Sequence, residues 1–158
     1  LSCVVVGARD DAYSRMLRKL SQELTADRRD RFHIVPVTGE TAKYWLAADL
    51  FCCSSRVESY PHVIQEAMAA GLPVITTPVF GISEQVRESV NALLYEPGDV
   101  QALARHLTEL ASDDAKRQDF AEASRWTLES LPNPFDMTRR YSWVFRSAAE
   151  SAPIRCTH

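Results

Sequence analysis

Short apolar runs alternate with longer amphipathic segments along most of the 158 residues. The runs are a few residues long and rich in Val, Ile, Leu and Phe, which is typical of strands covered on both faces of a sheet. We expect such strands at 2–7, 32–37, 50–53, 72–77 and 92–95.

Between these runs the apolar residues recur at intervals of three and four, which is the spacing of an amphipathic helix. The first stripe is predicted to be buried and consists of Tyr13, Met16, Leu17, Leu20 and Leu24. Further helices are expected at 42–48, at 61–70, near Ser83, at 100–110 and at 112–128. Asp10 or Asp11 can cap the first helix, and Asn133 can cap a last helix that begins at Pro134.

Strands that alternate with helices predict an α/β fold, with a Rossmann-like parallel sheet and helices on both faces. Ligands of such sheets bind beyond the carboxyl ends of the strands. The loops after Gly7, Val37, Cys53 and Thr77 are therefore the candidate binding loops.

Domain boundaries follow from a break in the pattern at Leu131-Pro132. We expect one domain over 1–131, a C-terminal helix over 132–150 and a disordered tail over 151–158. The chain begins directly in a strand without an initiating Met, as expected for a fragment of a longer polypeptide.

The segment 58–71 joins two of the expected strands and carries the strongest functional pattern. Pro61 suits the first turn of a helix and Gly71 suits its C′ position. Glu58 precedes this helix and Glu66 lies in its second turn, so two carboxylates bracket one helix N-terminus. Carboxylates bind hydroxyls and helix N-termini bind phosphates, and a nucleotide sugar carries both groups.

Composition narrows the possible partners. The net charge of −3 predicts no general attraction to nucleic acid, and no apolar run is long enough for a transmembrane helix. The four cysteines, Cys3, Cys52, Cys53 and Cys156, show no Cys-x-x-Cys spacing, so we expect no metal site. We expect these cysteines to be buried free thiols, which is typical of proteins in the reducing cytoplasm, so the predicted location is cytoplasmic.

The order of these motifs resembles the C-terminal, donor-binding domain of GT-B glycosyltransferases of family 4, also described as glycosyl transferases group 1. The resemblance rests on the E-x7-E segment from Glu58 to Glu66 with its continuation Ala-Met-Ala-Ala-Gly-Leu-Pro-Val, and on the flanking segments 47–51, 80–86 and 91–99. It covers about residues 1 to 111.

The resemblance implies roles for individual residues. Glu58 would be the catalytic residue and hold hydroxyls of the donor sugar, while Glu66 would accept hydrogen bonds from the ribose. The other donor-binding residues would be Ser59, Tyr60, Pro61, His62, Val63, Val37 and Thr38. Backbone N–H groups of Tyr60, His62 and Val63 would face the diphosphate, and Val37 and Thr38 would meet the base.

The resemblance also implies a sugar transfer from a nucleoside diphosphate sugar to an unknown acceptor, with retention and with neither metal nor cofactor. Such transfers serve polysaccharide or glycan biosynthesis. A facing N-terminal acceptor-binding domain is missing here, and membrane association, if it occurs, would come through that domain. The family's Gly-Arg strand end and its following Lys are missing too, and Arg56 and Arg87 are poor substitutes by position. We therefore expect the isolated chain to be inactive.

Two alternatives stay open at this point. A nucleotide-sugar epimerase of the same fold would need acid and base groups near the sugar. A phospho-receiver domain shares the doubly wound sheet, and Asp10 and Asp11 would fit its acidic pair. Asp49 does not fit, because it begins the third expected strand instead of ending it.

Overall fold

The computed structural model describes residues 1–131 and 133–151. It contains β1 (Cys3–Ala8), α1 (Ala12–Gln22), α2 (Ala26–Arg29), β2 (Phe32–Pro36), α3 (Ala42–Ala47), β3 (Phe51–Cys53), α4 (His62–Ala69), β4 (Val74–Thr76), α5 (Ile82–Gln85), β5 (Ala92–Leu94), α6 (Val100–Ser112), α7 (Asp114–Ser130) and α8 (Pro134–Ser151). All strand pairs are parallel. The α/β class is confirmed, because each parallel connection carries a helix.

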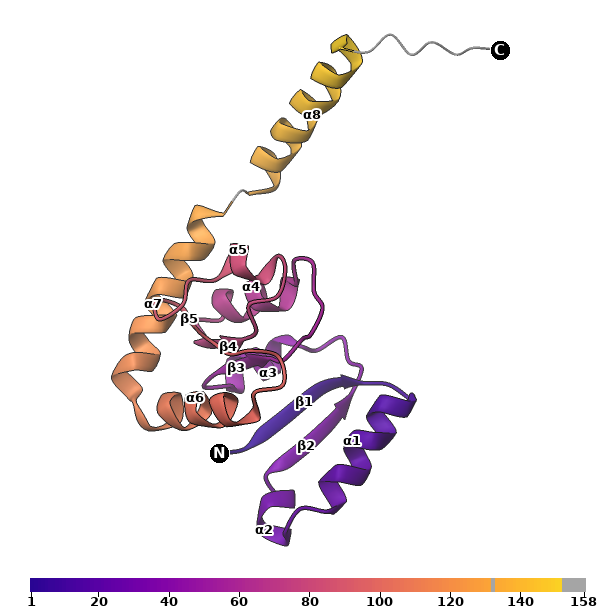
Figure 1. The fold of residues 1–158 in the computed structure, drawn as a ribbon, viewed down its shortest axis with the longest axis vertical. Coiled ribbons are helices and arrows are strands. Elements are labelled where there is room, and N and C mark those ends of the chain that lie inside the picture. Colours follow the sequence, from indigo (N-terminus) through magenta and orange to yellow (C-terminus); the bar gives the residue numbers. More distant parts are fainter. Residues whose placement is uncertain (132, 152–158) are drawn as a thin grey trace.

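The strands form two separate sheets. β1 pairs with β2, and β3, β4 and β5 form a second sheet in that order. Within the described residues, no hydrogen bond joins β1 to β3, although β1 lies on the side of β2 that faces the second sheet (Figure 1). The single sheet that the sequence predicts is therefore divided between β1 and β3.

The core is built around the three-stranded sheet. Val74 and Ala92 point into a cluster with Ile64, Ala67 and Met68 of α4. Their neighbours along the strands, Ile75 and Leu93, point into an opposite cluster that α6 and α7 complete. Side chains alternate between the two faces of a strand, so this sheet has helices on both sides, as predicted.

The N-terminal pair of strands is much less covered. Val4 is 47% exposed and Tyr13 is 65% exposed, and Met16 and Leu20 are also exposed. The prediction that the first strand and the stripe on the first helix are buried is therefore wrong for this structure. An apolar pattern shows which face a helix or strand can bury, but it does not supply the element that covers that face.

Two of the cysteines differ from the prediction for the same reason, whereas the burial of Cys53 is confirmed. Cys53 is buried against α4, whereas Cys3 and Cys52 are exposed on the facing strands β1 and β3. Cys156 lies outside the described residues.

Local signals for helix ends are confirmed at several positions. The Ser14 amide donates to Asp11 Oδ1 at 2.7 Å, and the Asp136 amide donates to Asn133 Oδ1 at 3.0 Å. Gly71 has a φ of 73° and follows the C-cap of α4. Pro134 is the first residue of α8. The disordered tail predicted over 151–158 lies almost wholly outside the described residues, since only Ser151 is included.

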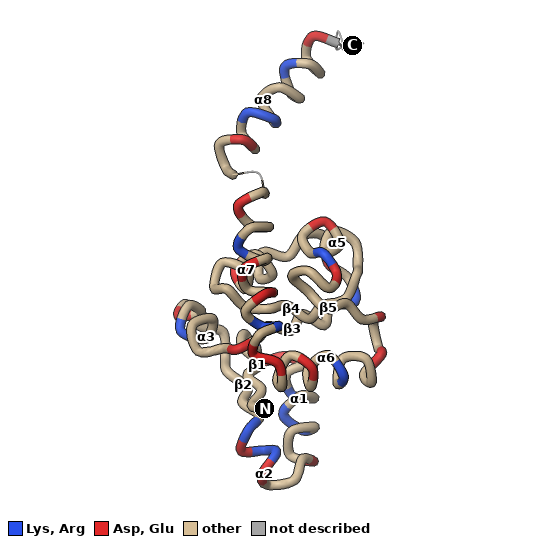
Figure 2. The backbone as a smooth tube through the Cα atoms, turned by 90° about the vertical axis from the view of Figure 1, so that its left-hand side faces the viewer, with Lys and Arg blue, Asp and Glu red and all other residues tan. Residues whose placement is uncertain are grey.

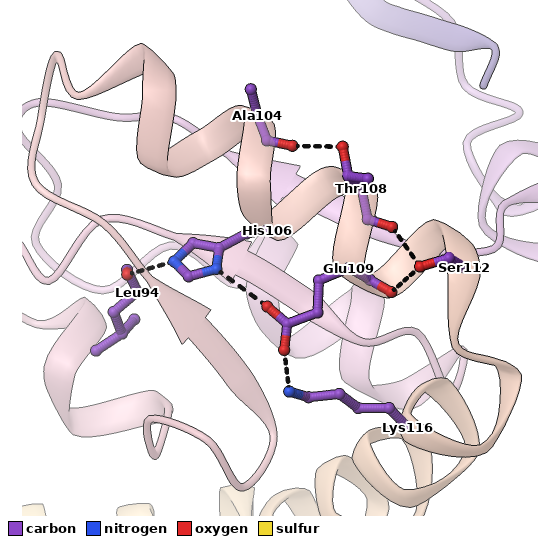
Figure 3. Close-up of polar contacts among 7 residues, drawn as sticks. All are labelled: Leu94, Ala104, His106, Thr108, Glu109, Ser112 and Lys116. Atoms are coloured by element: carbon purple, nitrogen blue, oxygen red, sulfur yellow. Dashed lines mark hydrogen bonds and ion pairs between the residues drawn. The ribbon is translucent and has the colours of Figure 1, made fainter.

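Helices α6 and α7 are tied to each other and to β5 by a polar network (Figure 3). His106 Nε2 lies 3.0 Å from the Leu94 carbonyl oxygen, and His106 Nδ1 lies 3.6 Å from Glu109 Oε2. Lys116 of α7 forms an ion pair with Glu109. This pair lowers the pKa of Glu109, chiefly because Lys116 donates a hydrogen bond to the carboxylate.

Charged residues of both signs are mixed along α2 and its neighbours (Figure 2). Arg31 and Asp27 form an ion pair at 2.7 Å there. α8 extends away from the other elements in both views (Figures 1 and 2). Its exposed apolar side chains are Phe135, Met137, Tyr141, Trp143, Val144 and Phe145.

Candidate functional site

The segment between β3 and α4 brings the predicted carboxylates to the carboxyl edge of the three-stranded sheet. Glu58 is half-buried, and its Oε1 accepts a hydrogen bond from Ser55 Oγ at 3.5 Å. Glu66 is exposed on α4. Among the described residues, neither carboxylate forms an ion pair, so Glu58 does not pair with Arg56. Both carboxylates are therefore available to a ligand.

The N-terminus of α4 presents open backbone donors. Pro61 is the N-cap with φ −70° and ψ 123°, whereas the sequence predicted it in the first turn. The helix therefore begins one residue later than predicted, at His62. Among the described residues, the amides of Tyr60, His62 and Val63 have no acceptor. The first amides of a helix have no partner within it, and an anion can fill that role.

The segment that follows β4 holds the segment between β3 and α4 in place. Thr76 Oγ1 donates to the Cys53 carbonyl at 3.0 Å, and Thr77 Oγ1 donates to the Ser55 carbonyl at 2.5 Å. Gln85 is fully buried, and its Nε2 donates to the Pro61 carbonyl at 3.2 Å. The carbonyl groups before α4 are thus bonded by side chains of β4, of the residue after it and of α5, which fixes the direction of the α4 N-terminus.

Gly81 completes this contact between the two loops. A β-carbon at this position would collide with the carbonyl group of Ser59 and lie 3.4 Å from Cδ2 of Tyr60. Only glycine therefore permits the observed approach. Sequence reasoning missed Thr77, Gly81 and Gln85 as supports. The available signal for Thr77 and Gly81 was their position shortly after β4, which ends at the same edge of the sheet, whereas nothing local signals Gln85 at the end of α5.

Tyr60 and His62 line a surface cavity of about 720 Å³. Gln65 of α4 and Arg140 of α8 line the same cavity. Arg140 is a cation near the predicted diphosphate position, where the sequence offered only Arg56 and Arg87. Nothing in the local sequence of α8 signals this position, because it depends on how α8 follows α7.

Val37 and Thr38 follow β2 directly, and the Val37 amide donates to the Ala8 carbonyl at 3.2 Å. No hydrogen bond among the described residues connects them to the segment 58–66. The Thr38 hydroxyl accepts instead from the Glu40 amide at 3.1 Å. Their assignment to the base of the nucleotide stays a prediction, as do the ligand roles of Glu58, Ser59, Tyr60, Pro61, His62, Val63 and Glu66.

Residues 1–131 and 133–151 contain neither a candidate metal site nor a candidate membrane span. No group of three or more His, Cys, Asp or Glu side chains there could hold a metal ion. Among the same residues, no helix is long and apolar enough to cross a bilayer.

Comparison with known proteins gives the following relatives. The chain is 35% identical to a D-inositol 3-phosphate glycosyltransferase of Corynebacterium urealyticum over 121 residues, which cover 73% of this chain and 28% of that protein. It is 32% identical to the lipopolysaccharide core biosynthesis glycosyltransferase LpsE of Rhizobium meliloti over 112 residues, which cover 71% of this chain and 32% of that protein. The chain therefore spans about a third of the length of these relatives.

Solved structures agree with this comparison. Sucrose-phosphate synthase of Thermosynechococcus elongatus superposes with a TM-score of 0.81 at 27% identity, over 94% of this chain and 39% of that one. HepE of Anabaena in complex with UDP-glucose superposes with a TM-score of 0.81 at 23% identity, over 92% of this chain and 41% of HepE. The fold is accordingly that of part of a GT-B glycosyltransferase.

The model of the family described as glycosyl transferases group 1 matches residues 1–126, about four fifths of the chain. Together with the relatives above, this match shows that the chain belongs to the glycosyl transferases group 1 family.

Proposed function

We propose that this chain is the donor-binding part of a family 4 glycosyltransferase, which transfers a sugar from a nucleoside diphosphate sugar to an acceptor hydroxyl. The observation that carries the proposal is the α4 N-terminus, where Tyr60, His62 and Val63 offer unpaired amides between two unpaired carboxylates. Amides suit the diphosphate, and carboxylates suit sugar and ribose hydroxyls.

In the proposed reaction the bond between the sugar C1 and the diphosphate oxygen breaks, and the nucleoside diphosphate leaves with the bonding electrons. The acceptor oxygen forms the new bond to C1 and loses its proton. Open amides of α4 stabilise the charge that develops on the leaving group, because they are already oriented toward it. Arg140 lines the adjoining cavity and is a candidate for the missing cationic partner.

The finer parts of the proposal rest on the family resemblance. They are retention of configuration, transfer without a metal, a facing acceptor-binding domain and a cytoplasmic site of action in glycan biosynthesis. HepE was solved with UDP and with UDP-glucose, so UDP-glucose is the first donor to test. An epimerase of the same fold would act on the same donor without an acceptor. The family match speaks against the phospho-receiver alternative.

A thermal-shift experiment tests the proposal. UDP, GDP and ADP are each added at 10 mM to the chain, with inorganic pyrophosphate as the control. With a dissociation constant on the order of 0.1–1 mM, the preferred nucleotide stabilises the folded chain by about 1.4–2.7 kcal/mol, and the unfolding midpoint of the chain rises by several degrees. Equal shifts with pyrophosphate and with all three nucleotides would indicate only an anion site and contradict the proposal.

A further inference from the structure

Phe80 adopts a backbone conformation that a bulky residue normally avoids. It follows β4 with a φ of 46°, in the left-handed region that favours glycine. Its side chain is 70% exposed, so burial of the ring does not compensate for the strain. The surrounding structure must therefore hold Phe80 in place, and strain of this kind is concentrated at functional sites.

The backbone around Phe80 is held on both sides. The Ser83 amide donates to the Phe80 carbonyl at 3.3 Å, and Ser83 Oγ donates to the Pro78 carbonyl at 3.2 Å. The next residue, Gly81, packs against the Ser59 carbonyl, one position from Glu58. Phe80 is thus fixed beside the loop that carries the candidate catalytic carboxylate.

The ring itself has no structural role that the described residues reveal. It belongs to neither core cluster and stands at the carboxyl edge of the sheet, where ligands of parallel sheets bind. Ser89 is the other residue in the described part of the chain that has a positive φ without being glycine. Ser89 precedes β5 and so belongs to the amino edge, which makes it a matched position away from the site.

We propose that Phe80 is a specificity-determining residue that packs its ring against the apolar face of the donor sugar. A hexose ring presents C–H groups on its faces and hydroxyls around its edge. An exposed aromatic ring in the loop that packs against the loop of Glu58 matches both, with Phe80 on the face and Glu58 on the hydroxyls. This inference rests on the proposed donor site and adds the group that recognises the sugar.

The test compares nucleotides with and without the sugar. Three pairs are titrated into the full chain and followed by protein NMR: UDP and UDP-glucose, GDP and GDP-mannose, ADP and ADP-glucose. For the pair that binds, F80A and F80G should each weaken binding of the sugar nucleotide about 5- to 20-fold, because the apolar contact with the ring is lost. The affinity for the nucleoside diphosphate alone should stay within about twofold of that of the parent, and F80Y should bind both ligands like the parent.

Loss of the same size for both members of the pair, or for neither, overturns the role of Phe80 while the donor site stands. Binding of none of the six ligands overturns the donor site itself. F135A removes an exposed Phe of α8, and S89G removes the matched strain at the amino edge. Neither control should change the preference for the sugar nucleotide.

Stability provides a second readout. F80A and F80G both remove the ring, but only glycine relieves the positive φ. F80G should therefore melt about 1–4 °C above F80A, because the strain that glycine removes exceeds the backbone entropy that glycine adds. An F80G variant that melts below F80A would show that the backbone at this position is not strained, and would remove the reason to assign Phe80 a function.

Discussion

At the scale of single residues, the two carboxylates of the site are held differently. Glu58 is half-buried in the loop and receives a hydrogen bond from Ser55, whereas Glu66 projects from the exposed face of α4. Neither has an ion-pair partner among the described residues. Two carboxylates without ion-pair partners beside open amides can receive a ligand that carries both hydroxyls and phosphates, and this arrangement is the basis of the assignment.

Substitution of Glu58 should weaken binding of the donor sugar without weakening binding of the nucleotide. We expect E58A to weaken a bound nucleotide sugar by about 1.5–3 kcal/mol, the usual range for a hydrogen bond to a charged group, and to leave the nucleoside diphosphate unaffected. Calorimetry on both ligands measures the difference. A loss of equal size for both would mean that Glu58 acts on the phosphates or on the loop.

Gly81 provides a test of the contact between the loops. G81A places a methyl group against the Ser59 carbonyl, so the free energy of unfolding should fall by about 1–3 kcal/mol, the usual cost of overpacking. Nucleotide binding should weaken as the loop shifts. The matched control is G39A, because nothing lies within 4 Å of a β-carbon there and Gly39 has no positive φ. Urea midpoints that agree for the two variants would contradict the proposed contact.

At the scale of helices and strands, sequence signals succeeded where the cause is local. A carboxylate three residues before an amide predicts the Asp11 cap, and the need for a positive φ predicts the place of Gly71. The strain at Phe80 was not predicted, because no local pattern calls for a left-handed Phe. The supports from Thr77 and Gln85 were missed as well, since they bridge residues 22 and 24 positions apart.

The network between α6 and α7 predicts a pH dependence (Figure 3). The folded-state pKa of Glu109 is lowered by Lys116, so this pair stabilises the fold above the ordinary carboxyl pKa. The contribution is lost as the pH falls through the lowered value. Because Glu109 is 41% exposed, solvent screening limits it to about 0.5 kcal/mol.

The measurement compares E109Q with the parent protein. The variant should be less stable at pH 7, and the difference in unfolding free energy should shrink toward pH 3. E122Q is the control, because Glu122 lies exposed on α7 without a partner among the described residues. A difference that stays constant between pH 7 and pH 3 would show that the ion pair contributes nothing.

At the scale of the whole molecule, the sheet is divided. The edge of β1 that faces β3 has no hydrogen-bond partner among the described residues, and apolar side chains of β1 and α1 stand exposed. The apolar pattern predicted the strands and their parallel direction, but not which strands would be neighbours. Pairing between distant segments depends on the complete set of strands, and the chain spans about a third of its relatives.

The proposed donor site by itself also predicts weak binding without turnover. The site faces water and Arg140 lines the adjoining cavity without an ion pair among the described residues, so its electrostatic and positioning contributions are small. We expect no multiple-turnover transfer when these 158 residues are incubated with donor and a broad acceptor mixture. Fusion to the N-terminal part of a full-length member of the family should restore it. Multiple-turnover transfer by the 158 residues alone would place the whole catalytic machinery within them.

The central claim is that a nucleotide binds between Glu66 and the N-terminus of α4, and its most direct test is a calorimetric titration of the parent and E66A. UDP, GDP and ADP are used, and circular dichroism confirms that both proteins are folded. The account predicts a dissociation constant on the order of 0.1–1 mM for the preferred nucleotide, and a loss of about 1.5–3 kcal/mol in E66A as the ribose hydrogen bonds disappear. Equal affinity of E66A and the parent for all three nucleotides would contradict it.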